Sequence, residues 1–202
     1  MRITVACFGA RLLAGLLCLA VPLLAGAGSA AAAGLTSIVV EQATGEIVSQ
    51  SGADQPNYPA SLTKMMTLLL TFEALRAGRL ELDTPLRVSA RAASMPPSKL
   101  GLPPGATIRV EEAIRALAIK SANDIAVVLA EHLAGSETRF AQLMTRKAQQ
   151  IGMYHTIFRN ASGLPDRQQR TTARDIARLA VHLIRDYPEY YSYFSEGSFR
   201  FR

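Results

Sequence analysis

Ser61 and Lys64 are the residues of this sequence whose types and spacing first suggest covalent chemistry. They lie three positions apart at the predicted start of a helix, so the hydroxyl and the amine project from one face, about one turn apart. Burial and the positive end of the helix should lower the pKa of Lys64, leaving a neutral amine to accept the Ser61 proton. Arginine could not do this, because a guanidinium stays protonated. The pair therefore predicts acyl transfer on Ser61, with the Ser61 N–H near the developing oxyanion.

A second polar group, Ser121-Ala122-Asn123, begins sixty residues after Ser61, at the break between two predicted helices. Ser121 could relay a proton toward a leaving amine, and Asn123 could bind Lys64 or the substrate backbone. Helix capping is the alternative for each motif taken alone, since serine and asparagine are preferred cap residues. The catalytic interpretation therefore depends on the two motifs occurring together.

Other chemistries find little support in the sequence. Two of its three histidines, His132 and His182, fall in predicted amphipathic helices, and we expect structural or surface roles for them and for His155. The sequence contains no Gly-x-Ser-x-Gly elbow, phosphate-binding glycine loop or set of zinc ligands. We therefore expect no metal and no cofactor. The net charge is +6, but the basic residues are scattered, which argues against a nucleic-acid partner.

The elements that must position these residues are mostly helical. Apolar spacing predicts helices over 61–77, 110–119, 124–133, 137–151 and 172–187. The first is apolar almost all round, so we expect it to be central and buried. The last begins with Thr172 and Asp175 in a capping-box arrangement.

The remaining segments read as a hairpin and a loop. Alternating β-branched residues over 36–42 and 46–50, separated by Ala43-Thr44-Gly45, predict an antiparallel hairpin. Residues 87–107 contain four prolines and two glycines, which is typical of a loop. A two-stranded hairpin is marginal in water, so we expect it to need further strands.

The first 33 residues have the layout of a secretory signal peptide. Two arginines precede or begin an apolar run over 12–24, and small residues with Ala-x-Ala sites fill 25–33. An uncleaved membrane anchor is the alternative, but the apolar run is short for a bilayer span. Cys7 and Cys18 both lie in this segment, so the mature chain should have neither a disulfide nor a thiol nucleophile. We expect an exported chain with one domain over 34–202.

Two stretches, Pro59 to Thr67 (PASLTKMMT) and Lys120 to Asp124 (KSAND), closely resemble the first two active-site motifs of the low-molecular-mass penicillin-binding proteins. These are the D-alanyl-D-alanine carboxypeptidases, serine peptidase family S11. The similarity covers nearly all of 34–202, in order and with the family's spacing. It includes Ala43-Thr44-Gly45, Pro97 to Leu102, Leu129-Ala130-Glu131, Gly152-Met153, Thr156 to Pro165 and Thr171 to Asp175.

The resemblance implies an α/β (α+β) fold, a penicillin-recognising domain of the β-lactamase/transpeptidase type, with a helical body against an antiparallel sheet. It implies that Ser61 attacks the D-Ala-D-Ala terminus of a peptidoglycan stem peptide, with Lys64 as base. Ser121 would complete the proton network with Asn123, which also contacts the substrate. β-Lactams would acylate Ser61 as mimics of the dipeptide. The expected location is the periplasm or the outer face of the cytoplasmic membrane.

One departure from the family pattern is the third motif, Lys-Thr-Gly or Lys-Ser-Gly. The four lysines are followed by Met65, Leu100, Ser121 and Ala148. We therefore expect a catalytic domain incomplete at its C-terminus, without the strands that carry this motif and pair with the hairpin. Peripheral membrane association is expected only through a missing C-terminal region.

Two rival functions remain open. A truncated, non-catalytic peptidoglycan-binding protein would explain the missing motif. A class A β-lactamase shares both visible motifs, but it needs a deacylating glutamate in a Glu-x-x-Leu-Asn loop. No Asp or Glu occurs between Ala141 and Leu164, which disfavours the lactamase.

Overall fold

The computed structural model describes residues 36–201, all of which belong to the compact unit Gly34–Arg202. The predicted signal peptide and both cysteines lie outside the described residues. Each helix within residues 36–201 is too short or too polar to span a membrane.

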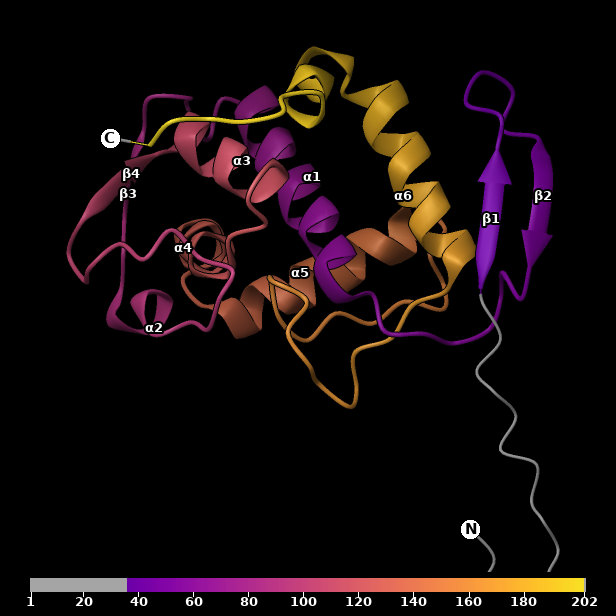
Figure 1. Ribbon diagram of the computed structural model, residues 1–202, viewed down its shortest axis with the longest axis horizontal. Coiled ribbons are helices and arrows are strands. Elements are labelled where there is room, and N and C mark those ends of the chain that lie inside the picture. The colour runs from indigo at the N-terminus through magenta and orange to yellow at the C-terminus, as the bar shows by residue number, and fades with distance from the viewer. Residues whose placement is uncertain (1–35, 202) are drawn as a thin grey trace, which may run out of the picture. The chain divides into compact units, whose positions relative to one another are not determined.

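The described residues form a helical body with two small antiparallel sheets (Figure 1). The long helices are α1 (Thr63–Arg76), α3 (Val110–Ala118), α4 (Asn123–Ala134), α5 (Glu137–Gln150) and α6 (Ala173–Asp186). Two 3-10 helices, η1 (Ala60–Leu62) and η2 (Pro188–Phe194), precede α1 and follow α6. The five predicted helices are therefore confirmed, with ends shifted by one or two residues.

Helix α1 lies at the centre of this body and contacts α3, α4, α5 and α6. Its apolar residues Met66, Leu69 and Phe72 are fully buried, and the prediction of a central helix is confirmed. The polar residues Lys64 and Thr67 are buried as well, so they need partners inside the protein.

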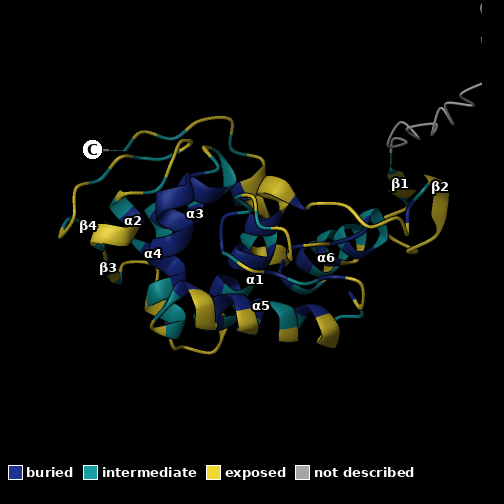
Figure 2. Cartoon of the chain, turned by 90° about the horizontal axis from the view of Figure 1, so that it is seen from below, coloured by how far each residue is buried: buried dark blue, intermediate teal, exposed yellow. Residues whose placement is uncertain are grey.

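Helix α4 is the other central element and is dark blue along most of its length in Figure 2. Its residues 123–130 are all buried, because NDIAVVLA presents an apolar or small side chain in nearly every direction. The helix stops at Gly135, whose φ of 75° is the left-handed conformation that glycine adopts without strain. The predicted helix 124–133 agrees with the observed one to within one residue at each end.

The predicted capping box of α6 forms only in part. The Thr172 hydroxyl accepts a hydrogen bond from Asp175 N–H at 3.1 Å, as expected. The Asp175 carboxylate turns to another segment and accepts from His155 N–H at 2.9 Å and the Thr156 hydroxyl at 2.8 Å. Because this carboxylate is fully buried, it ties the start of α6 to the preceding loop.

The predicted hairpin is present as β1 (Ser37–Val40) and β2 (Ile47–Ser51), which pair antiparallel with an irregular register between Val39 and Val40. Among the described residues, no further strand pairs with β1 or β2. Strand β1 contacts α6, whereas β2 is exposed along its whole length. The hairpin therefore gains most of its tertiary support from one side.

The interpretation of residues 87–107 as loop was wrong in part. This segment contains α2 (Ala90–Ala93) and joins β3 (Pro85–Arg87) to β4 (Thr107–Arg109), which form the second antiparallel pair. Strands of three residues are too short to show a hydrophobic period. Leu86 and Ile108 face each other in this pair and are buried, so packing rather than local pattern defines it.

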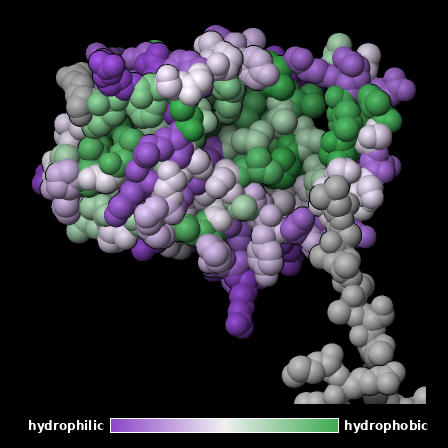
Figure 3. All heavy atoms as spheres, viewed as in Figure 1, coloured by the Kyte–Doolittle hydropathy of each residue, from purple (hydrophilic) through white to green (hydrophobic). Residues whose placement is uncertain are grey.

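An apolar groove of about 540 Å³ runs between β1, α6 and the start of α1. Its lining includes Ile38, Tyr58, Leu62, Met65 and Ile176. Figure 3 shows hydrophobic side chains gathered on this face of the described residues. Tyr58 and Leu62, which flank the nucleophile candidate in sequence, are among its exposed members.

Candidate active site

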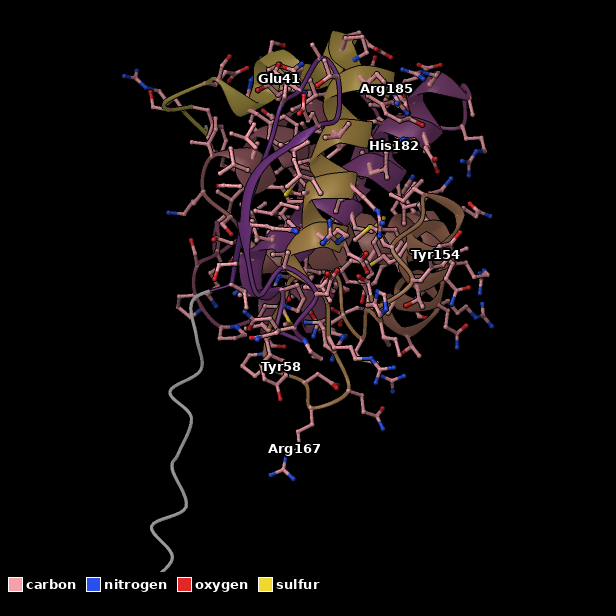
Figure 4. All side chains as sticks on the ribbon, turned by 90° about the vertical axis from the view of Figure 1, so that its right-hand side faces the viewer. Glu41, Tyr58, Tyr154, Arg167, His182 and Arg185 are labelled. Atoms are coloured by element: carbon pink, nitrogen blue, oxygen red, sulfur yellow. The ribbon has the colours of Figure 1, made fainter. Side chains whose placement is uncertain are left out.

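Ser61 lies in the middle of η1, directly before α1, and is exposed to solvent. The residue before it, Ala60, has a φ of 46°, a left-handed conformation that costs a non-glycine residue energy. The surrounding structure must therefore hold this turn in place. Tyr58, three residues before Ser61, is 64% exposed and lies near the lower end of the described residues in Figure 4.

Lys64 is the second residue of α1, and only 3% of its surface is exposed. Its Nζ donates hydrogen bonds to Asn123 Oδ1 at 2.8 Å and to the carbonyl oxygen of Ser162 at 2.6 Å. Burial lowers the pKa of the Lys64 amine from 10.5 to about 8, because desolvation disfavours the ammonium form. Roughly a tenth of the amine is therefore neutral at pH 7, and about half at pH 8.

Asn123 is the first residue of α4, and it does not cap that helix. Its Nδ2 donates to the Pro96 carbonyl at 3.0 Å, so its Oδ1 faces Lys64. Its backbone N–H donates to the Ser98 carbonyl at 2.7 Å. The cap residue of α4 is Ala122, which has no side-chain cap bond, so the capping interpretation of this motif was wrong.

Ser121 is partly buried and has a φ of 56°, the second strained residue beside the predicted site. Among the described residues, no side chain or backbone group hydrogen-bonds the hydroxyl of Ser61 or of Ser121. The structure thus joins Lys64 to Asn123 directly, while the two hydroxyls stay free for other partners. Their roles as nucleophile and proton relay stay predictions.

The loop 160–164 also contributes to this site, although the sequence analysis assigned no role to its residues. Asn160 Oδ1 accepts hydrogen bonds from Ser162 N–H at 3.2 Å and Gly163 N–H at 2.7 Å, which folds the loop tightly. The Thr67 hydroxyl donates to the Ala161 carbonyl at 2.7 Å. These bonds place the Ser162 carbonyl against the Lys64 amine. The turn-forming letters Asn-Ala-Ser-Gly were the only local signal for this loop.

Gly163 brings the same loop against the turn formed by Ala60 and Ser61. A Cβ at this position would lie 1.7 Å from the Ala60 carbonyl oxygen, and the φ of Gly163 is 86°. Glycine is therefore needed here both for its conformation and for the close approach. One short loop thus contacts the Lys64 amine through Ser162 and the turn at Ala60 and Ser61 through Gly163.

Comparison with known proteins identifies the family. The family model described as D-alanyl-D-alanine carboxypeptidase, Peptidase S11, matches residues 25–202. The chain belongs to this family. Within the family, the carboxypeptidase DacF of Bacillus subtilis is 36% identical over 150 residues, covering 74% of this chain and 39% of DacF.

Solved structures of the family agree with the fold. Penicillin-binding protein 5 from Haemophilus influenzae has a TM-score of 0.79 and 35% identity, over 83% of this chain and 49% of that one. Penicillin-binding protein D2 from Listeria monocytogenes, solved with ampicillin bound, has a TM-score of 0.64 and 29% identity, over 76% of this chain and 62% of that one. The expected α+β fold of the transpeptidase type is confirmed. The chain spans less than half the length of the curated family members that it matches.

Proposed function

We propose that this chain supplies the nucleophile and base of a serine-type D-Ala-D-Ala carboxypeptidase. The observation that carries the proposal is Lys64, a buried amine held by two acceptors in the turn after Ser61. A buried lysine with a pKa of about 8 can be neutral at physiological pH and can take a proton from a nearby hydroxyl. Family membership supports the reaction class.

In the proposed reaction, the Ser61 oxygen attacks the carbonyl carbon of the peptide bond between the two terminal D-alanines, and Lys64 takes the hydroxyl proton. Collapse of the tetrahedral intermediate breaks the C–N bond. The proton that Lys64 took from Ser61 passes through Ser121 to the leaving amine. Water then hydrolyses the Ser61 ester, which frees the shortened peptide and restores the hydroxyl. Asn123 accepts a hydrogen bond from Lys64, and in this proposal it also contacts the substrate backbone.

We further propose that the acyl donor is a peptidoglycan stem peptide, and that β-lactams acylate Ser61 in its place. The ampicillin-bound Listeria protein supports the β-lactam proposal by likeness. We also propose export to the periplasm or to the outer face of the cytoplasmic membrane, which the signal-like sequence of residues 1–33 supports.

Penicillin labelling of the purified chain tests the proposed nucleophile. Wild-type protein treated with benzylpenicillin should gain one penicilloyl adduct by intact-mass spectrometry, and Ser61→Ala should gain none. Ser49→Ala is a suitable control, because Ser49 is an exposed hairpin serine. Labelling that persists in Ser61→Ala would contradict the assignment of the nucleophile.

A non-catalytic, peptidoglycan-binding role is the competing function. Penicillin labelling, combined with assays of peptidoglycan binding and of D-alanine release, distinguishes the two functions. A folded wild-type chain that binds peptidoglycan but forms no adduct would favour the binding role, whereas release of D-alanine from a pentapeptide would establish the enzyme.

A further inference from the structure

The two acceptors around the Lys64 amine come from different parts of the chain, and the segments that hold them meet at one buried carboxylate. That carboxylate belongs to Glu137, the first residue of α5, which is only 5% exposed. Its two oxygens point in different directions, one toward the loop 160–164 and one toward α2.

The first connection runs through the loop 160–164. Glu137 Oε1 accepts a hydrogen bond from Ala161 N–H at 3.2 Å. The carbonyl of Ala161 is held by Thr67 from α1, and the carbonyl of the next residue, Ser162, accepts from Lys64. Glu137 and Thr67 therefore hold the peptide units on both sides of Ala161, and a shift there would move the Ser162 acceptor.

The second connection runs through α2. Arg91 donates to Glu137 Oε2 through Nε at 3.2 Å and also through Nη2. Helix α2 leads directly into residues 94–98, whose Pro96 and Ser98 carbonyls hold the side chain and backbone of Asn123. The ion pair thus ties the segment that orients the Asn123 acceptor to the same carboxylate.

We propose that Glu137 is a positioning residue for Lys64, whose carboxylate fixes the Ser162 carbonyl and, through Arg91, the Asn123 amide around the amine. This role rests on the proposed function of Lys64 as a base. Glu137 does not touch the nucleophile or the amine, so it acts only through the groups that it holds.

The charges around Glu137 are consistent with this role. A buried carboxylate is costly unless it is paired and hydrogen-bonded, and Arg91 meets that need although its own side chain is 61% exposed. The hydrogen bond that Arg91 donates to Glu137 raises the pKa of Arg91, with smaller contributions from the charges of Glu137 and of Glu131 on α4. Glu137→Ala would leave the Arg91 cation, but its side chain is 61% exposed and its charge is screened by solvent. The variant should therefore act on Lys64 mainly by admitting water to the amine, since desolvation is what lowers the Lys64 pKa.

The test compares Glu137→Ala with wild type by two measurements on the full chain. The chain has four lysines, so NMR of ¹³Cε-labelled lysine can follow the Lys64 titration directly, with Lys64→Arg for assignment. The rate of penicillin acylation is measured in parallel from pH 6 to pH 10. We expect Glu137→Ala to raise the Lys64 pKa by roughly one unit and to slow acylation at pH 7 about tenfold, since hydration favours the ammonium form.

Glu73→Ala is the matched control for a loss of stability alone. Glu73 is a partly buried carboxylate on α1, paired with Lys147 at 2.6 Å, and contacts neither acceptor of Lys64. In this variant the Lys64 pKa should stay within about 0.3 units of the wild-type value, and the acylation rate within about twofold. If Glu137→Ala behaves in the same way, Glu137 is only structural and the proposal is wrong.

Two further variants keep the test decisive. Glu137→Gln retains an acceptor for Ala161 N–H but loses the ion pair, so it should recover part of the acylation lost in Glu137→Ala. Arg91→Ala changes an exposed side chain and can replace Glu137→Ala if that variant does not fold. If the Lys64 pKa of Arg91→Ala equals that of wild type, the proposed connection through α2 is wrong. A wild-type chain that forms no penicilloyl adduct would count against the proposed function, and the lysine titration would still decide the role of Glu137.

Discussion

Burial of the Lys64 amine is unfavourable for its charged form, yet the proposed role as a base depends on that burial. An ammonium group is strongly hydrated, yet α1 and the loop 160–164 remove Lys64 from water. Two oxygen acceptors compensate only part of the lost hydration, so the pKa falls to about 8. The same desolvation that destabilises the cation makes the neutral amine accessible as a base.

The pH dependence of acylation follows from this shift. Below pH 8 the amine is mostly protonated and cannot accept the Ser61 proton, so the acylation rate should rise about tenfold per pH unit toward pH 8 and then level off. Lys64→Arg should lose at least roughly a hundredfold in rate and should lack this rise, because arginine does not deprotonate. Stopped-flow labelling with a fluorescent penicillin checks both, and a flat wild-type profile from pH 6 to pH 9 would contradict the base role.

Stability should follow the same group in a defined direction. The folded pKa of Lys64 lies below the ordinary lysine value of 10.5, so the unfolded chain binds more protons between about pH 8 and pH 10.5. The contribution of Lys64 to the free energy of unfolding therefore rises with pH through that window. Below pH 8 the full cost of burying the ammonium is present.

At the scale of elements, the site depends on a loop packed against a helix start. The loop 160–164 carries no regular secondary structure, yet its carbonyls are held by Thr67 and used by Lys64. Gly163 touches the carbonyl of Ala60, whose φ of 46° is strained. We infer that this contact helps to hold the nucleophile turn in its conformation.

Gly163→Ala should therefore damage both stability and acylation. Its methyl group would have to occupy space taken by the Ala60 carbonyl, and such overpacking costs about 1–3 kcal/mol, to which the positive φ adds about 1 kcal/mol. Gly105→Ala is the matched control, because Gly105 has the same φ of 86° but meets only Arg87 at 3.9 Å. Urea unfolding of both variants checks the difference; equal losses of stability would show that the contact with Ala60 is unimportant.

At the scale of the whole described structure, the two small sheets differ in how they are supported. The pair β3 and β4 buries Leu86 and Ile108 in the hydrophobic core. The hairpin of β1 and β2 rests on α6 mainly through β1. Strand β2 is exposed throughout, and its Gln50 Oε1 accepts a hydrogen bond from Arg174 Nη2 of α6 at 2.8 Å. Arg174 of α6 adds an ion pair to Asp54 at 2.7 Å just after the hairpin. Exposed ion pairs of this kind contribute little stability.

Hydrogen exchange should separate these two sheets. We expect amides of residues 37–51 to exchange faster than those of β3 and β4, because a two-stranded hairpin with one supported side opens at low cost. Amides of α1 and α4 should be the slowest, since both helices lie in the core. Exchange measured by mass spectrometry at peptide resolution checks the order. Protection of β2 equal to that of β3 would show that the hairpin has support beyond α6.

Much of the fold could be predicted from the sequence. Periodic apolar residues located the five long helices to within two residues at each end. Alternation and a turn located the hairpin. The short elements α2, β3 and β4 were missed, because segments of three or four residues contain too few positions to show a period.

By itself, the sequence determined the chemical types at the site and their local spacing. Ser61 and Lys64 are three residues apart, and their neighbours alone specify a helix start. Tertiary structure alone decided what surrounds the Lys64 amine, because its acceptors lie 59 and 98 positions away in the chain. One of them is a backbone carbonyl, a group that every residue carries and that no pattern of side chains can reveal. Glu137 escaped notice for the same reason, since only folding brings it to Ala161 and Arg91.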